Sequence, residues 1–363
     1  MLQGFPEVGE YKVLVECITY NHAQFIEDTL CGFAMQQTSF PYICCVYDDA
    51  SPDGEQEVLR QWVNDHCNPE DVKTYDHPLT IILMAPDKDN PNCIYAIHLQ
   101  KVNTWGKPEK RVMMRHWKNQ CEYVALCEGD DYWIDPLKLQ KQVDFLEANP
   151  EYVITHTGFQ YLGTSKTRKP LTNTHTESNL EIINNNDNIV VQILDHNKYR
   201  IQTCTVLFRR STFDIVANEY SSLCRRLKMG DTPLWLLLFS MGKIHFMPEE
   251  TSKYRLVDGS ASHSKSIKGM LEFGLSVSEM RLYFMKKYTI PEKYKKKFNQ
   301  EYIYFLTRYL WIEPSYKPEY QPIFESIYSR IKFYILTHTF VRWLCKYIYI
   351  YRNNKRWSLE LYK

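Results

Sequence analysis

Hydrophobic and polar positions alternate along the first half of the chain with two different periods. Short apolar runs such as YKVLVECIT (11–19) have the composition of buried strands. Between these runs, apolar residues recur at helical spacing, as Ile26, Leu30 and Phe33 do within 22–37. The pattern predicts strands over 11–19, 43–47, 79–84 and 123–127, and helices over 22–37, from a cap at 51–53 through Trp62, and through Leu139, Val143 and Leu146. This alternation is typical of an α/β fold, with a mostly parallel sheet flanked by helices.

The later segments have a less regular pattern. Residues 87–117 are polar and contain Pro91 and Pro108, which predicts a loop with one helix. Residues 164–188 are rich in Thr, Asn and His and predict a surface excursion. Strands are predicted over 203–208 and 243–247, with a helix over 232–241 between them. From 269 onward the pattern is helical throughout.

Charge divides the chain into two parts. The net charge is only +1, which argues against a dedicated nucleic-acid-binding protein. Residues 270–363, however, hold 17 Lys and Arg against 8 Asp and Glu, a balance of +9, and 14 of the 27 tyrosines. Residues 1–269 have a balance of −8. We therefore expect an α/β domain over 1–268 and a basic, Tyr-rich helical region over 269–363.

Cysteine usage and hydropathy bear on the cellular compartment. The eleven cysteines are an odd number, include the adjacent pair Cys44 and Cys45, and form no CxxC motif. This pattern predicts reduced thiols that act as small core residues. The first thirty residues lack a basic segment followed by an apolar one, and no uncharged apolar run reaches about 18 residues. We expect a cytoplasmic protein without a secretory signal or a membrane-spanning helix.

Carboxylates follow predicted elements at three places. Asp48 and Asp49 come after the second strand, Glu128, Asp130 and Asp131 come after the strand over 123–127, and Asp231 precedes an apolar helix. Ligands of open parallel sheets bind beyond the carboxyl ends of the strands, where such side chains share a crevice. The alternative for the first group is a turn that caps a helix, and for Asp231 a simple N-cap.

The Glu128–Asp131 group is the most specific of the three. Three carboxylates within four residues repel one another unless a cation neutralises them. Mg²⁺ and Mn²⁺ prefer oxygen ligands and often share them with substrate phosphates. We therefore expect a divalent metal here, with a solvated acidic turn as the alternative.

Four segments together resemble the family 2 glycosyltransferases with the GT-A fold. They are ITYNHAQFIEDTL, VYDDASPDG, LCEGDDYWIDPLKLQKQVDFLE and GDTPLW…YRLVDGSAS, which occur in the family's order within residues 10–265. The similarity is greatest to bacterial enzymes that build capsular and other surface polysaccharides. It implies a Rossmann-like GT-A fold with a C-terminal helical extension, and a nucleotide-sugar donor that is a UDP-sugar.

The resemblance also implies a donor site. Tyr20 and Asn21 match the loop that lines the nucleotide pocket, and Asp49 matches the acid that binds uracil. Arg255 matches a residue near the diphosphate. Asp130 contributes to this donor site as well.

A metal site and a base follow from the same resemblance. Asp130 and Asp131 match the metal-site acids, with Asp131 as the direct ligand of Mn²⁺ or Mg²⁺, and Glu128 stands where relatives have the first Asp of a DXD signature. Asp231 matches the catalytic base, although relatives often have Glu before it and this chain has Gly230. Relatives often place a His two residues after the Arg; here that position is Val257, and the nearest later histidine is His263.

These roles imply an inverting transfer. One base, a metal-bound leaving diphosphate and no protein nucleophile give a single displacement at the anomeric carbon. The acceptor would be a saccharide or a lipid-linked saccharide. Two alternatives are a catalytically inactive sugar- or nucleotide-binding scaffold and a nucleotidyltransferase, although the loop at 18–22 has no glycine for a phosphate-binding turn.

The end of the chain combines basic and aromatic residues. Residues 330–363 contain eight Lys and Arg and the single acid Glu360. Phe333, Leu336, Phe340, Leu344 and Tyr347 are expected on one helical face, and His338, Arg342 and Lys346 on another. Such helices bind the surface of anionic membranes, which predicts a peripheral contact at the inner face of the cytoplasmic membrane. The alternative is that they pack on the acidic domain or mediate self-association into a homo-oligomer.

Overall fold

The chain folds into two compact units. The computed structural model describes residues 5–6, 9–163, 175–185, 188–195, 198–257, 266–324, 326–338 and 341–350. The first unit comprises 1–187, 199–219 and 237–257, and the second comprises 188–198, 220–236 and 258–363. Two helices, α7 (Arg210–Cys224) and α8 (Asp231–Phe239), each continue from one unit into the other.

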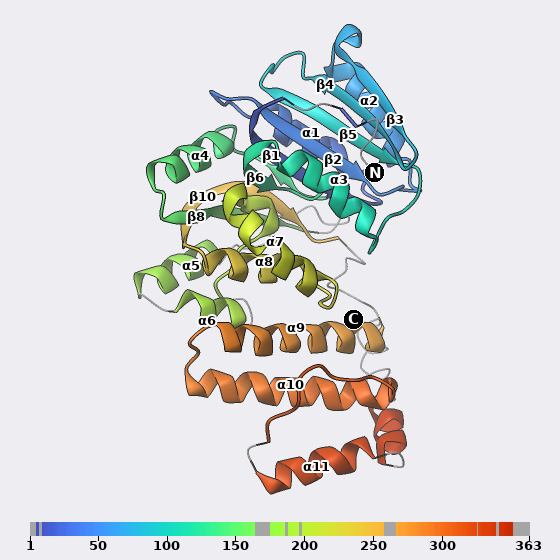
Figure 1. The fold of residues 1–363 in the computed structure, drawn as a ribbon, viewed down its shortest axis with the longest axis vertical. Coiled ribbons are helices and arrows are strands. Elements are labelled where there is room, and N and C mark those ends of the chain that lie inside the picture. Colours follow the sequence, from blue (N-terminus) through green and yellow to red (C-terminus); the bar gives the residue numbers. More distant parts are fainter. Residues whose placement is uncertain are drawn as a thin grey trace. The chain divides into compact units, whose positions relative to one another are not determined.

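The first unit is built on one ten-stranded sheet (Figure 1). Its strand order is β3-β4-β5-β2-β1-β6-β9-β8-β10-β7. The strands are β1 (Tyr11–Thr19), β2 (Tyr42–Asp48), β3 (Lys73–His77), β4 (Thr80–Pro86), β5 (Cys93–Gln100), β6 (Cys121–Leu126), β7 (Tyr132–Trp133), β8 (Tyr152–Leu162), β9 (Leu207–Arg209) and β10 (Lys243–Arg255).

The centre of the sheet is parallel. Strand β1 pairs in parallel with β2 and β6, and β2 pairs in parallel with β5. All seven residues of β2 are buried, as expected for a strand covered on both faces. The carboxyl ends of β1, β2 and β6 therefore lie at one edge of the sheet, and the predicted α/β fold with helices around a parallel core is confirmed.

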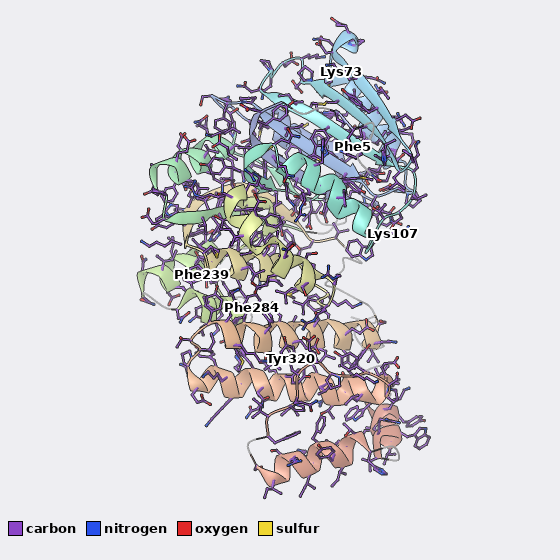
Figure 2. The ribbon with its side chains drawn as sticks, viewed as in Figure 1. Phe5, Lys73, Lys107, Phe239, Phe284 and Tyr320 are labelled. Atoms are coloured by element: carbon purple, nitrogen blue, oxygen red, sulfur yellow. The ribbon has the colours of Figure 1, made fainter. Side chains whose placement is uncertain are left out.

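Antiparallel pairings extend the sheet on both sides. Strand β4 pairs antiparallel with β3 and β5, and β9 joins β6 to β8 by antiparallel pairs. The edge strand β3 begins at the exposed Lys73, which Figure 2 labels. The prediction of a loop with one helix over 87–117 is wrong in part, because it contains β5 as well as α3 (Pro108–Lys118).

Four helices of the first unit agree with the predicted ones in order, and a fifth, α5 (His175–Asn184), was not predicted, because it lies in the segment expected to be a surface excursion. The four are α1 (Ile26–Ala34), α2 (Glu55–His66), α3 and α4 (Lys138–Ala148). The predicted strand over 203–208 begins instead as a 3-10 turn (Thr203–Thr205) and pairs only from Leu207. In the predicted excursion over 164–188, positions 164–174 and 186–187 lie outside the described residues.

The second unit is helical, and the described residues from 269 onward have the helical structure that their pattern predicts. It contains α6 (Ile189–Leu194), α9 (Ile267–Lys287), α10 (Glu292–Ile312), α11 (Ile327–Thr337) and a helix over 341–350. Its core joins α9 to α10 through Leu271, Leu275, Tyr302 and Leu306, and also includes Tyr320, which Figure 2 labels. Among the described residues, no helix has both the length and the apolar character that crossing a bilayer requires.

Residues between Phe333 and Tyr347 were expected on one helical face, and the structure corrects this. Helix α11 ends at Thr337, and His338 has an extended backbone (ψ 144°). Phe333 packs against the core of the second unit, so it does not belong to an exposed face. Phe340, Arg352, Lys355, Arg356, Glu360 and Lys363 lie outside the described residues.

Most cysteines are core residues. All eleven are free thiols, and eight of them are buried. Burial raises the pKa of Cys17, Cys44 and Cys127 well above the usual value, so these thiols are poor nucleophiles. The prediction that the cysteines fill the core is confirmed for these eight.

Candidate functional site

Three loops meet at the carboxyl ends of β1, β2 and β6. The backbone N–H of Asp49, after β2, donates to the carbonyl of Thr19 at the end of β1 (3.1 Å). The N–H of Gly129, after β6, donates to the carbonyl of Ile18 (3.1 Å). The loops are thus held together by main-chain hydrogen bonds, and the side chains that they carry share one region.

The loop after β6 forms a compact carboxylate cluster. Ligand oxygens of Glu128, Asp130 and Asp131 all lie within 4.8 Å of one another. Glu128 is exposed, Asp130 is half-buried and Asp131 is fully buried. The burial of the three side chains therefore increases along the loop, and the carboxylate oxygens of Asp131 are the most deeply buried.

The two carboxylate oxygens of Asp131 have different surroundings. Its Oδ1 accepts a hydrogen bond from the backbone N–H of Arg255 in β10 (2.8 Å), and its carbonyl accepts one from Thr29 Oγ1 in α1 (2.6 Å). Its Oδ2 is buried and has no N–H or O–H donor among the described residues, and only the weakly donating thiol of Cys204 interacts with the carboxylate. A buried carboxylate oxygen without a strong donor is costly unless a cation binds it.

The protonation behaviour of Asp131 agrees with that interpretation. Burial raises its pKa well above the usual value, and the charges of Asp130 and Glu128 raise it further. A divalent cation would reverse both effects, because it stabilises the ionised form. The residues present therefore fit an oxygen-ligated Mg²⁺ or Mn²⁺.

Arg255 lies beside this cluster in a buried position. Its Nη2 forms an ion pair with Asp28 Oδ2 of α1 (2.7 Å). The guanidinium lies 4.3 Å from the ring centroid of Phe25 and 5.3 Å from that of Tyr132. Its Nη1 is buried and has no hydrogen-bond partner among the described residues. One donor of this fixed cation is therefore available to an anionic ligand.

The loop after β1 contains the predicted nucleotide-binding residues. Tyr20 is 43% exposed, which leaves its ring accessible for stacking. Asn21 has a φ of 61°, and its N–H donates to Ser51 Oγ in the loop after β2 (3.0 Å). Ala50, in that second loop, has a φ of 60°. Left-handed backbone at non-glycine residues is concentrated at functional sites, and here it marks both loops.

Asp49 is held rigidly in the loop after β2. It is almost fully buried, and its Oδ1 accepts hydrogen bonds from the N–H (2.6 Å) and the Oγ1 (2.7 Å) of Thr104. The preceding Asp48 accepts from Gln56 Nε2 (2.5 Å) and from the N–H of Ser51, so it stabilises the turn but does not cap α2, whose N-cap is Gly54. The two adjacent acids therefore differ in environment, and the predicted uracil contact of Asp49 stays a prediction.

Sequence reasoning missed a buried carboxylate between these loops. Glu55, the first residue of α2, is fully buried, and it accepts hydrogen bonds from Thr19 Oγ1, from the N–H of His22 (3.0 Å) and from Ser51 Oγ (2.8 Å). Burial raises its pKa, while these hydrogen bonds oppose the rise. The available signal was its place one residue after the DG turn at 53–54.

The geometry of this site does not test two further predicted residues. Asp231 is the exposed first residue of α8 and belongs to the second unit, so its role as the base stays a prediction. His263 lies outside the described residues.

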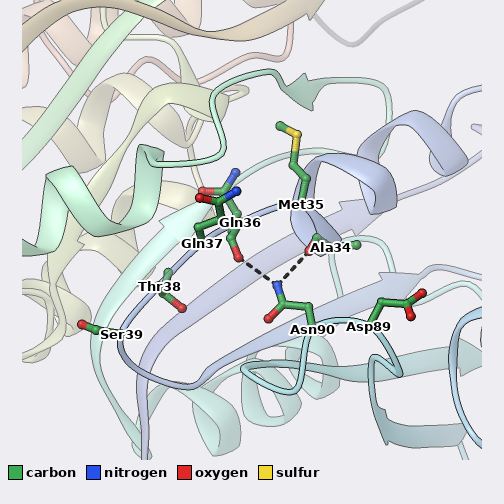
Figure 3. A pocket seen from close by; sticks show the side chains of 8 residues that line it. All are labelled: Ala34, Met35, Gln36, Gln37, Thr38, Ser39, Asp89 and Asn90. Atoms are coloured by element: carbon green, nitrogen blue, oxygen red, sulfur yellow. Dashed lines mark hydrogen bonds between the residues drawn. The ribbon is translucent and has the colours of Figure 1, made fainter.

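A separate pocket of about 560 Å³ lies near the amino ends of the central strands (Figure 3). It is lined by residues of two loops, 34–39 and 89–90, which precede the amino ends of β2 and β5. Asn90 Nδ2 donates to the carbonyls of Ala34 and Gln36 (2.8 Å each) and so joins the two loops. Because ligands of parallel sheets bind at carboxyl ends, we do not assign the chemistry to this pocket.

Comparison with known sequences gives a partial match. No family model matches the chain. Uncharacterized proteins of Mycobacterium tuberculosis (Rv1520) and Mycobacterium bovis (Mb1547) are 32% identical to it over 137 residues. The match covers 38% of this chain and 32% of each relative, so the chain spans about a third of the length of these relatives.

Comparison with solved structures gives distant similarities. The Staphylococcus aureus TarS structure in complex with UDP-GlcNAc is 15% identical, with 90% of this chain and 82% of that chain covered and a TM-score of 0.49. The mannosyltransferase PcManGT from Pyrobaculum calidifontis, in complex with GDP-Man and Mn²⁺, is 15% identical, with coverages of 84% and 72% and a TM-score of 0.45. We therefore base the functional proposal on this chain's own residues.

Proposed function

We propose that the chain is a metal-dependent, inverting glycosyltransferase of the family 2 type that transfers a hexose from a nucleotide-diphosphate donor. The observation that carries this proposal is the buried Oδ2 of Asp131, which has no N–H or O–H donor among the described residues, within the Glu128–Asp131 cluster and beside the fixed Arg255. The four sequence segments that resemble the family supply these same residues. The cluster lies at the carboxyl end of β6, where an open sheet binds its ligand.

The donor would bind across the three loops. Asp131 and Asp130 would hold Mn²⁺ or Mg²⁺, which supplies Lewis-acid stabilisation of the leaving diphosphate. The free Nη1 of Arg255 would add a fixed positive charge for the same group. Tyr20, Asn21 and Asp49 would bind the nucleoside, and we take uridine as the base, on the resemblance of Asp49.

The acceptor would be deprotonated by Asp231. A single base opposite the leaving group, with no protein nucleophile, inverts the anomeric centre. The acceptor class is a saccharide or a lipid-linked saccharide of a surface polysaccharide, which rests on the sequence resemblance.

A donor screen tests the proposal directly. The full chain is incubated with Mn²⁺ and a panel of nucleotide sugars, and the released nucleoside diphosphate is measured. We expect release from a UDP-sugar by the wild type, none by Asp131→Asn, and wild-type release by Asp144→Asn, an exposed acid of α4. Equal activity of Asp131→Asn and the wild type would exclude the assignment, and inactivity of the wild type on every donor would favour the scaffold alternative.

We also propose that the chain docks on the inner face of the cytoplasmic membrane through its last described helices. Ile327, Ile331, Tyr334 and Ile335 form an exposed stripe on α11, and Trp343, Leu344, Tyr347 and Ile348 are exposed on the helix over 341–350. Residues 326–350 contain Arg330, Lys332, Arg342 and Lys346 and no Asp or Glu. Exposed aromatic and aliphatic residues next to cations suit an anionic lipid surface.

Vesicle co-sedimentation tests this contact. The full chain should sediment with anionic vesicles and not with neutral ones, and Ile331→Ser should weaken binding several-fold. Ile215→Ser, at an isoleucine of α7 that is more exposed than Ile331, is the matched control. If the chain ignores anionic vesicles and instead forms oligomers by light scattering, the exposed stripe is a self-association surface.

A further inference from the structure

The buried Glu55 carboxylate links the loops after β1 and β2. One oxygen, Oε2, accepts from two groups, the N–H of His22 (3.0 Å) and Ser51 Oγ (2.8 Å). Ser51 Oγ in turn accepts from the N–H of Asn21 (3.0 Å). Glu55 therefore fixes the backbone of both loops, including that of the left-handed Asn21.

The other oxygen begins a chain of hydrogen bonds that ends at His22, a residue that lies beside Asp130 of the acidic cluster. Thr19 Oγ1 donates its single proton to Glu55 Oε1, because an ionised carboxylate can only accept. Thr19 Oγ1 also lies 3.2 Å from His22 Nδ1, a contact whose direction depends on the tautomer of the ring. With its proton given to an ionised Glu55, Thr19 can only accept there, from an Nδ1–H group. The neutral imidazole then has its lone pair on Nε2, which lies 3.8 Å from Asp130 Oδ2.

We propose that Glu55 is a positioning residue that sets the tautomer of His22 through Thr19. In this tautomer the unprotonated Nε2 faces Asp130 and can serve as a nitrogen ligand of the cation. Histidines near metals commonly have their second ring nitrogen fixed by a hydrogen-bonded partner in this way. The sequence resemblance assigns no such role to Glu55, Thr19 or His22. This inference rests on the proposed function, because it concerns the cation that Asp130 and Asp131 would hold.

The variant Glu55→Gln gives the sharpest test, because an amide must point its NH₂ group toward one of the two sides. The Oε2 side faces two donors, whereas the Oε1 side faces only the rotatable hydroxyl of Thr19. The amide should therefore donate to Thr19, whose hydroxyl then donates to His22 Nδ1. The His22 tautomer should reverse to Nε2–H, which cannot bind a cation.

The tautomer is measured by long-range ¹H–¹⁵N NMR on the metal-free protein. We expect Nδ1–H in the wild type and in the control Glu57→Gln on the same helix, Nε2–H in Glu55→Gln, and a mixture in Thr19→Val. Manganese affinity, followed by electron paramagnetic resonance, should fall about 10- to 100-fold in Glu55→Gln and stay unchanged in the control.

Two results would overturn the inference. One is a wild-type protein with Nε2–H, and the other is a folded Glu55→Gln variant with the wild-type tautomer and Mn²⁺ affinity, even if its melting temperature falls. Thr19→Val keeps the test decisive if Glu55→Gln does not fold. The NMR readout needs neither donor nor turnover, so its outcome is separate from failure of the donor screen.

Discussion

At the scale of single residues, the acidic cluster depends on a glycine. A Cβ on Gly129 would lie 2.1 Å from Thr19 Oγ1 and 2.5 Å from Thr19 Cβ, and Thr19 is fixed by its hydrogen bond to Glu55. We expect Gly129→Ala to lower the free energy of unfolding by about 1–3 kcal/mol and to weaken Mn²⁺ binding. Denaturant unfolding and a Mn²⁺ titration measure both effects.

A second glycine separates the steric effect from the loss of glycine itself. A Cβ on Gly106 would meet nothing within 4 Å. The backbone of Gly106 is left-handed (φ 74°), so Gly106→Ala should lower the free energy of unfolding by about 1–2 kcal/mol through backbone strain alone. It should leave Mn²⁺ binding unchanged. Equal Mn²⁺ affinities in the two variants would show that the loop after β6 accommodates a side chain.

The proposed base can be tested at the same scale. Asp231→Asn should reduce turnover by about 10²–10⁴-fold and leave donor affinity unchanged, because the base acts on the acceptor. Turnover and donor binding are measured separately, by product release and by calorimetry, with Asp144→Asn as the control. Loss of donor affinity with residual turnover would place Asp231 in the donor site instead.

At the scale of elements, the packing of α9 against α10 depends on a close approach. A Cβ on Gly274 of α9 would lie 2.2 Å from a ring carbon of Phe305 in α10. Because the added methyl group would overpack this contact, Gly274→Ala should lower the free energy of unfolding by about 1–3 kcal/mol. Adding Phe305→Leu to this variant should restore most of the lost stability. Calorimetry of the two single variants and the double variant checks this. Strict additivity would show that the two positions do not interact.

The sequence predicted the elements with strong local periodicity and missed those that depend on distant partners. Strand β1 has its predicted bounds, because its apolar run is buried on both faces. Strand β5 was missed, because Pro91 and a polar segment precede it and its identity as a strand depends on pairing with β2 and β4. Strand β8 was missed because it lacks a continuous apolar run such as that of β6. Its residues Thr155, His156 and Thr157 are polar although they are buried.

The site was predicted in the same uneven way. The density of acids made Asp130 and Asp131 visible in the sequence, and the structure brings them together with Arg255 through the Asp131–Arg255 hydrogen bond. Glu55 and Asp28 were not predicted, because their importance comes from partners 36 and 227 positions away. Tertiary contacts of this kind leave no local pattern in one sequence.

At the scale of the whole molecule, buried histidines make stability depend on pH. Burial lowers the pKa of His98 in β5 and of His156 in β8 to about 3. An unfolded histidine has a pKa near 6.5, so between about pH 6.5 and 3 the unfolded chain binds more protons than the folded one. The free energy of unfolding should therefore fall as the pH falls through this window, by up to about 1.4 kcal/mol per pH unit for each histidine.

Unfolding by denaturant at several pH values measures this slope. In His156→Gln the amide can still accept a hydrogen bond from Tyr199, which His156 Nε2 contacts at 3.0 Å, but it cannot titrate. We expect the slope below pH 6.5 to decrease by up to about 1.4 kcal/mol per unit in this variant. An unchanged slope would show that His156 is protonated in the folded state.

The cysteines differ in burial, so an exposed thiol can be labelled selectively with a fluorescent dye. Cys31 is the exposed one of the eleven thiols, and it lies on α1 three residues after Asp28, the partner of Arg255. Partial burial and the neighbouring Asp28 and Glu27 raise its pKa, so a maleimide dye should react best under mildly alkaline conditions. A fluorophore attached there would report ligand binding next to the acidic cluster in the unmutated chain.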